Sequence, residues 1–179
     1  MLIADLRDAV ELRLLELRHA PEYHRMVCAN LTRLYWLPGP PSLADAEDRI
    51  RQGLRRLAEG SGFDSGIFER DLLVGFAGLF HIDPGQASGE IGYWIDHAAE
   101  GRDRVTRACR AVIGYGFREL ALHRIELRCG GSNVRSQAVA ERLGFRLEGR
   151  LREADRNGER WDDFLVYGLL AGEWQSQLK

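Results

Sequence analysis

Apolar residues recur along the chain with two different periods, and the period changes from one segment to the next. Steps of three and four residues, which are typical of amphipathic helices, occur in the segments 18–34, 42–60, 105–120 and 133–143. Alternation or a short apolar run, which is typical of a strand, occurs in the segments 9–15, 65–69, 72–81, 89–95, 123–129, 145–152 and 161–170. The pattern therefore predicts the element order β-αα-βββ-α-β-α-ββ.

Turn and capping residues mark where several of these elements begin and end. Ser42 is a residue type that favours the N-cap position, here of the second helix, and Gly144 stands where a left-handed C-cap is expected after the fourth helix. Asn157-Gly158 predicts a tight turn between the last two strands. The proline-rich run 36–41 cannot be helical, so we expect an ordered loop there.

Helices and strands are interspersed along the chain without a repeat, a linker or a low-complexity segment. This order predicts a mixed sheet with helices on its faces, which is an α+β (mixed α/β) fold. A length of 179 residues suits one compact unit, so we expect residues 1–179 to form a single domain.

Charge and cysteine content narrow the range of partners. A formal net charge of −2 gives no bulk attraction to nucleic acid or to an anionic membrane. The three cysteines have no CxxC spacing, and two of them lie on apolar faces, so we expect buried thiols and no metal site. Because the sequence contains no signal peptide and no apolar run of membrane-spanning length, we expect a cytoplasmic protein.

Three polar groups interrupt the apolar pattern at the ends of elements. The run EGRDRVT at 100–106 precedes the third helix, and backbone N–H groups at a helix N-terminus attract phosphate. The corner GGSNVRS at 130–136 follows a buried strand, and Glu90 is a carboxylate in the otherwise apolar strand GEIGYW. Each group alone is more often an exposed cap or a solvent-facing side chain. Their order and spacing together indicate a ligand site.

These segments together resemble the GNAT-type N-acetyltransferase superfamily, and within it the RimJ/RimL branch that acetylates the N-termini of ribosomal proteins. The resemblance covers nearly the whole chain and is carried by GEIGYWI, by EGR and, after positions 103 and 104, VTRACRAVIGYGFRELALHRIELRC, by the N-x-x-S of Asn133 and Ser136, and by ERLGFRLEG and DDFLVYGLL. It implies an acyl-CoA N-acyltransferase fold whose central sheet is splayed between the strands 89–95 and 123–129. Pantetheine would lie in the splay, and the pyrophosphate of acetyl-CoA would lie on the 100–106 loop.

The resemblance also implies roles for single residues. Acetyl transfer to an amine needs a neutral amine, and Glu90 or Asp155 would accept its proton directly or through water. Ser136 would protonate or position the departing thiolate, and backbone N–H groups near Trp94 and Ile95 would polarise the thioester carbonyl. The residues expected to bind acetyl-CoA are Trp94, Ile95, Gly101, Arg102, Asp103, Arg104, Val105, Thr106, Asn133 and Ser136.

The pyrophosphate loop departs from the superfamily pattern R/Q-x-x-G-x-G/A at Asp103, which stands where the pattern has a glycine. If that position requires φ > 0, a side chain there costs about 1–2 kcal/mol. A carboxylate at a helix N-terminus is itself an N-cap, so it would occupy the amides that the phosphates need. A like charge about 5 Å from a phosphate costs roughly 3 kcal/mol at an effective dielectric near 20. Arg102 and Arg104 could offset this cost, and Arg107 could pair with Asp103.

Two functional hypotheses follow. The near-complete motif set favours an acetyl-CoA-dependent N-acyltransferase. Asp103 motivates the alternative, a GNAT-fold binding or assembly module with impaired CoA binding.

The motifs leave the acceptor of the acetyl group open between the N-terminus of a ribosomal or other protein and a small primary amine. The variable region 21–62 and the tip at 153–162 would form the acceptor surface, with Tyr35, Trp36 and Trp161 as aromatic walls or as ordinary packing. Acidic residues at the tip suit a cationic acceptor: Asp155, Glu159, Asp162 and Asp163. Members of the superfamily often form dimers, so the resemblance allows a homodimer here.

Overall fold

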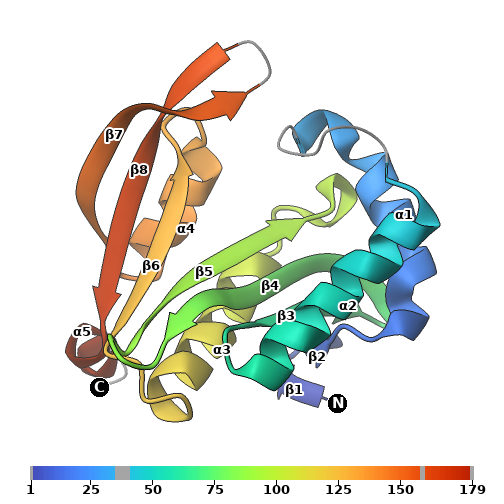
Figure 1. Ribbon diagram of the computed structural model, residues 1–179, viewed down its shortest axis with the longest axis horizontal. Helices are drawn as coiled ribbons and strands as arrows, with labels where there is room; N and C mark the ends of the chain where they lie inside the picture. The colour runs from blue at the N-terminus through green and yellow to red at the C-terminus, as the bar shows by residue number, and fades with distance from the viewer. Residues whose placement is uncertain (1, 35–40, 158–159, 178–179) are drawn as a thin grey trace.

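Figure 1 shows a computed structural model of the chain, which describes residues 2–34, 41–157 and 160–177. The described residues form a sheet with the strand order β1-β2-β3-β4-β5-β6-β8-β7. Its strands are β1 (Leu2–Asp5), β2 (Val10–Leu14), β3 (Phe63–Glu69), β4 (Leu72–Asp83), β5 (Ser88–Ile95), β6 (Arg124–Gly130), β7 (Arg146–Asn157) and β8 (Arg160–Leu170). Neighbouring strands are antiparallel except β5 and β6, which are parallel.

The helices cover both faces of this sheet. They are α1 (Ala20–Ala29), α2 (Leu43–Glu59), α3 (Arg104–Arg118), α4 (Val134–Arg142) and α5 (Ala171–Gln177), with 3-10 turns η1 (Leu17–His19), η2 (Leu31–Arg33) and η3 (His97–Ala99). Helices α1 and α2 pack on β3 and β4, while α3 packs on the opposite face of β4, β5 and β6 (Figure 1). No helix in the described part of the chain is long and apolar enough to cross a membrane.

The predicted α+β architecture, with a mixed sheet and helices on both faces, is confirmed. The sequence pattern missed β1 and α5, and it ended the strand at 145–152 five residues before the end of β7 at Asn157. The loop prediction for 36–41 and the aromatic walls at Tyr35 and Trp36 fall on positions 35–40, outside the described residues; so does Gly158 of the predicted tip.

Local capping explains two of the helix boundaries. The Asp45 N–H donates to the Ser42 hydroxyl at 3.1 Å, and the Ser42 N–H donates to the Asp45 carboxylate at 2.7 Å, which closes a capping box before α2. After α4, Gly144 has φ +81°, the left-handed conformation expected of a glycine past a helix end.

Two apolar cores hold the helices on the sheet. On one face Ile50 of α2 and Met26 of α1 cluster with Phe68 and Phe76 of the sheet. On the other face α3 and α4 bury the larger cluster, in which the fully buried members include Val112, Ile113, Leu79, Ile125 and Leu127. Strand β6 therefore lies at the centre of the larger core.

The parallel contact between β5 and β6 ends abruptly, and this creates an opening in the sheet. The two strands pair only from Ser88 opposite Arg124 to Ile91 opposite Leu127. Beyond Ile91, β5 continues alongside β4, whereas β6 continues to Gly130 alongside β8. The two strands diverge, and the splay lies where it was predicted.

We expect Leu127→Ala to lower the free energy of unfolding by about 2–5 kcal/mol, because Leu127 is 1% exposed in the larger core. Urea denaturation measures this loss. The matched control is Leu147→Ala on edge strand β7, where the side chain is 55% exposed and the expected loss is about 0.5 kcal/mol or less. Equal losses in the two variants would contradict the placement of β6 in the core.

Candidate active site

A cavity of about 830 Å³ lies where β5 and β6 diverge. Its walls come from the end of β5, the start of α3, one side of α4, and the 3-10 turn η2 beside α1. It brings together most of the residues predicted to bind acetyl-CoA: Trp94, Ile95, Gly101, Asp103, Arg104, Val105, Thr106, Asn133 and Ser136. Arg102 is exposed in the same loop but does not line the cavity, and neither do Glu90 and Asp155.

The N-terminus of α3 faces this cavity with its amides open. Asp103 is the N-cap residue, and its side chain makes no capping hydrogen bond. The N–H groups of Arg104, Val105 and Thr106, in the first turn, have no acceptor within the helix. Gly101 has φ +79°, and a Cβ placed on it would meet no atom within 4 Å. Open amides, a helix dipole and an unobstructed glycine suit a diphosphate.

The expectation that the Asp103 carboxylate would cap these amides is wrong, and the backbone explains why. Asp103 adopts φ +57° and ψ +12°, whereas a side chain that caps a helix needs its residue in the extended region. The carboxylate instead lies 3.8 Å from Nη1 of Arg142 on α4. Arg107 does not pair with it either, because its guanidinium contacts Asp8 at 2.9 Å. The alternative of a module with impaired CoA binding thereby loses one of its supports, the occupation of the α3 amides by Asp103.

The side chain of Arg104 does not flank the cavity as expected. It is 2% exposed, and its guanidinium donates to the Glu69 carboxylate at the end of β3 and to the Ala99 carbonyl at 2.8 Å. The hydrogen bond from Arg104 lowers the pKa of Glu69 below its usual value. Arg104 therefore fixes the start of α3 to the sheet, and the residue still forms part of the cavity wall.

Glu100 links three elements at the cavity wall. Its carboxylate pairs with Arg33 of η2, with Arg135 of α4 at 2.6 Å and with His97 at 3.4 Å. Burial alone would raise the pKa of Glu100, but the hydrogen bond and charge of Arg33 and the charge of Arg135 outweigh it and lower the pKa. This cluster leaves two arginines beside the open amides of α3.

At the other end of the cavity, Ser136 meets the half-buried Tyr93. The hydroxyl groups of Tyr93 and Ser136 are 2.6 Å apart, and the Asn133 side chain accepts the Ser136 N–H at 3.1 Å. Burial strongly raises the pKa of Tyr93, so its phenol is neutral. The thiol of Cys129 also lies within hydrogen-bonding reach of Ser136, and burial raises its pKa. The Ser136 hydroxyl is therefore held in place by residues of β5 and β6.

The backbone of β5 offers N–H groups to the splay. The Asp96 N–H donates to the Val74 carbonyl, and hydrogen bonding in an antiparallel pair alternates, so Trp94 bonds to β4. The N–H groups of Tyr93 and Ile95 point the other way, toward the side from which β6 has departed. Of the two residues predicted to polarise a carbonyl, Ile95 has its amide in the splay, and Trp94 contributes its side chain to the wall.

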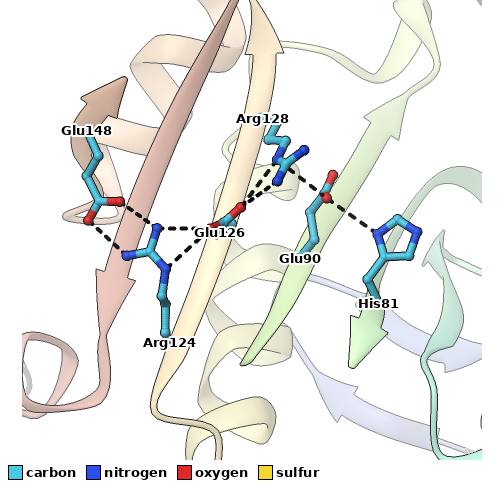
Figure 2. A network of polar contacts seen from close by, with 6 residues as sticks. All are labelled: His81, Glu90, Arg124, Glu126, Arg128 and Glu148. Carbon is cyan, nitrogen blue, oxygen red and sulfur yellow. Dashed lines mark hydrogen bonds and ion pairs between the residues drawn. The ribbon is translucent and has the colours of Figure 1, made fainter. Parts of the chain in front are cut away.

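Glu90 lies on the opposite face of the sheet, in the polar network of Figure 2. Its carboxylate is 3.5 Å from Nδ1 of His81 and 3.8 Å from Nε of Arg128, which in turn pairs with Glu126 at 3.0 Å. His81 has φ +48° at an irregularity of the β4–β5 pairing, and its side chain is directed toward Glu90 (Figure 2). The network covers the part of this face that α1 and α2 leave open.

Two of the acidic residues at the β7–β8 tip, which were expected to face a cationic acceptor, make hydrogen bonds within the fold instead. The Asp162 carboxylate accepts the Ser132 N–H at 2.7 Å, and the Asp163 carboxylate accepts the Glu153 N–H and pairs with Arg150. Glu159 lies outside the described residues. The half-buried Asp155 sits in β7 opposite Asp162, and its charge reaches the Cys129 thiol.

Comparison with known proteins identifies the family. The domain described as Acetyltransferase (GNAT) domain matches residues 9–146. The "Putative ribosomal N-acetyltransferase YdaF" of Bacillus subtilis (strain 168) is 34% identical over 182 residues, which covers 99% of this chain and 100% of that protein. The chain belongs to the GNAT acetyltransferase family.

Other relatives of this acetyltransferase agree in sequence and in fold. The "Ribosomal-protein-serine acetyltransferase" of Escherichia coli (strain K12) is 28% identical and covers 91% of this chain and 93% of that protein. The crystal structure of a "Probable acetyltransferase" superposes with a TM-score of 0.90 at 32% identity, over 97% of this chain and 99% of that one. The structure of RimL, a ribosomal L7/L12 alpha-N-protein acetyltransferase in complex with Coenzyme A, shares the fold at 24% identity, with a TM-score of 0.89 and 95% and 98% of the chains covered.

Several residues of the acetyltransferase site were missed by sequence reasoning. Tyr93 had a usable signal, since strand alternation places it on the same face as Ile91, but its contact with Ser136 spans 43 positions. Arg33, Arg135 and Arg142 are ordinary helix-surface arginines in the sequence, and only the fold brings them to the cavity.

We expect Glu69→Gln to destabilise the acetyltransferase by about 1–3 kcal/mol at pH 7, because it removes the charge that pairs with the buried Arg104. The folded-state pKa of Glu69 lies below the unfolded value of about 4.3, so the pair stabilises the fold above that pH and its contribution is lost as pH falls through the folded-state pKa. Urea denaturation at pH 7 and at acidic pH should show the gap between variant and wild type narrowing. A gap that does not change with pH would contradict this assignment. Glu59→Gln, at an exposed position, is the control.

Proposed function

We propose that this acetyltransferase transfers an acetyl group from acetyl-CoA to a primary amine, and that the α-amino group of a protein N-terminus is its acceptor. The observation that carries the proposal is the uncapped N-terminus of α3 beside the cavity in the splay. Relatives named as ribosomal N-acetyltransferases support the choice of acceptor, and a ribosomal protein is therefore the first candidate.

The chain supplies a place for each part of acetyl-CoA. The amides of 101–106 would hold the diphosphate, with the arginines at positions 33 and 135 as nearby cations. The open N–H groups of Tyr93 and Ile95 would pair with the pantetheine arm or with the thioester carbonyl. Asn133 orients the first turn of α4 and with it Ser136.

The acceptor would approach on the face where Trp94 lines the cavity, which is also the face of Glu90. Its nitrogen forms a bond to the acetyl carbon, the carbon–sulfur bond breaks, and the thiolate takes up a proton. The Ser136 hydroxyl, held by Tyr93 at 2.6 Å, is the donor placed for the sulfur. The neutral phenol of Tyr93 can pass a proton to the Ser136 hydroxyl or hold that hydroxyl in place by a hydrogen bond. We therefore assign to Ser136 first the role of a hydrogen-bond donor that positions the sulfur.

Glu90 would receive the acceptor's proton through water. It is four residue steps from Trp94 along β5, which is about 13 Å at roughly 3.3 Å per residue, so direct contact with an amine at the cavity is out of reach. An α-amino group with a pKa of about 8 needs only a weak base. Asp155 on β7 is a second carboxylate for the same task, and a test should compare the two.

The proposal is tested by calorimetric titration with acetyl-CoA followed by an acceptor panel. We expect binding with a Kd at or below about 100 μM and acetylation of peptides with free N-termini in preference to polyamines and amino sugars. An N-terminally blocked copy of each peptide, with its lysines intact, is the control for α-amino selectivity. No heat at millimolar acetyl-CoA would refute the cofactor, and equal rates on blocked peptides would refute the acceptor.

We expect Glu90→Gln to lower kcat/KM about 10- to 100-fold at pH 7 and much less at pH 9.5, where the amine is deprotonated without help. Initial rates across this pH range measure the effect. Glu148→Gln removes a carboxylate from the far end of the same network (Figure 2) and should leave the rate near that of the wild type. A loss of equal size at both pH values would assign Glu90 a structural role, and a loss seen only in Asp155→Asn would assign the base to β7.

A further inference from the structure

The cavity has an acidic and a basic side chain facing each other at its α3 end. Asp103 stands at the start of α3, and Arg142 is the last residue of α4. Nη1 of Arg142 donates to the Thr106 hydroxyl at 2.9 Å and lies 3.8 Å from the Asp103 carboxylate. Both charged side chains are 53% exposed, so they are accessible to a ligand in the cavity that both of them line.

We propose that Arg142 is the residue that allows this loop to bind a diphosphate although it carries an acidic residue. The backbone conformation of Asp103 keeps its carboxylate off the amides of α3, and the Arg142 guanidinium cancels the charge of that carboxylate while its remaining N–H donors stay available to the phosphates. The inference rests on the proposed use of acetyl-CoA, and it names the residue on which the affinity of this particular loop depends.

The charge balance requires such a partner. An unpaired carboxylate roughly 5 Å from a phosphate would weaken binding by about two orders of magnitude at an effective dielectric near 20. Arg104 cannot cancel it, because its guanidinium is buried against Glu69, and Arg107 is engaged by Asp8. Arg33 and Arg135 pair with Glu100, at the side of the cavity, and not with Asp103. Among the residues that the structure describes, Arg142 is the cation that makes an ion-pair contact with Asp103.

The backbone conformation of Asp103 keeps its carboxylate beside Arg142. Because Asp103 is held at φ +57°, its side chain cannot swing onto the first turn of α3 without changing the loop conformation. The Thr106 hydroxyl, which is 1% exposed, fixes the guanidinium from the other side. The pair therefore bridges the two helix ends that border the diphosphate end of the cavity.

A double-mutant cycle on acetyl-CoA binding tests the proposal. The proteins are the wild type, Arg142→Gln, Asp103→Asn and the double variant; Asn is chosen because it tolerates positive φ and removes only the charge. By calorimetric titration we expect Arg142→Gln to raise Kd about tenfold or more, and about threefold or less when Asp103 is already Asn. Arg146→Gln removes an exposed arginine outside the cavity and should leave Kd unchanged.

Two further readouts separate charge compensation from a merely structural role. The variants should bind acetylpantetheine, which lacks the diphosphate, as well as the wild type does, and the coupling between positions 103 and 142 should shrink at high salt. Equal effects of Arg142→Gln in both backgrounds, or an equal loss of acetylpantetheine binding, would overturn the proposal while acetyl-CoA still binds the wild type. A wild type that binds no acetyl-CoA would overturn both this inference and the proposed function.

Discussion

The site depends on the short length of one parallel strand pair. Strands β5 and β6 share four residue pairs and then follow different neighbours, β4 on one side and β8 on the other. Because a sheet normally satisfies its backbone groups by pairing, this divergence leaves N–H groups of Tyr93 and Ile95 facing a cavity instead of a strand. The ends of α3 and α4 then line that cavity, which gives it open helix amides on one side and the Asn133–Ser136 turn on the other.

The two faces of the sheet divide the chemistry between them. Ser136, Tyr93 and Cys129 meet on the face covered by α3 and α4, where burial raises the pKa of the phenol and the thiol and keeps both neutral. Glu90 and its partners His81 and Arg128 lie on the other face, in a network that water can reach (Figure 2). In the proposed reaction, a proton would be removed on the face that water reaches and another supplied on the face covered by α3 and α4, so that the two groups do not neutralise each other directly.

Sequence reasoning captured what depends on local pattern and on a shared set of motifs. The period of apolar residues gave most elements, and the motif order gave the splay and the residues around the cavity. It failed where a long-range contact decides the role of a side chain. Arg104 lies in the expected loop, but Glu69, 35 positions away, draws it into the core. The position of the Asp103 carboxylate depends on its backbone conformation, and the hydrogen bonds accepted by Asp162 and Asp163 depend on how β8 meets the turn after β6 and strand β7.

The unpaired edge of β5 has a consequence for the shape of any molecule that binds there. An open strand edge is usually a hazard, because another polypeptide can add to it and seed aggregation. Here the edge is recessed between β6 and the two helix ends, so a neighbouring chain in bulk solution cannot align with it along its length. The opening suits instead a slender, extended molecule whose carbonyl oxygens can accept hydrogen bonds from the vacant N–H groups. The recess that shields the strand edge therefore also limits the width of any molecule that can bind there.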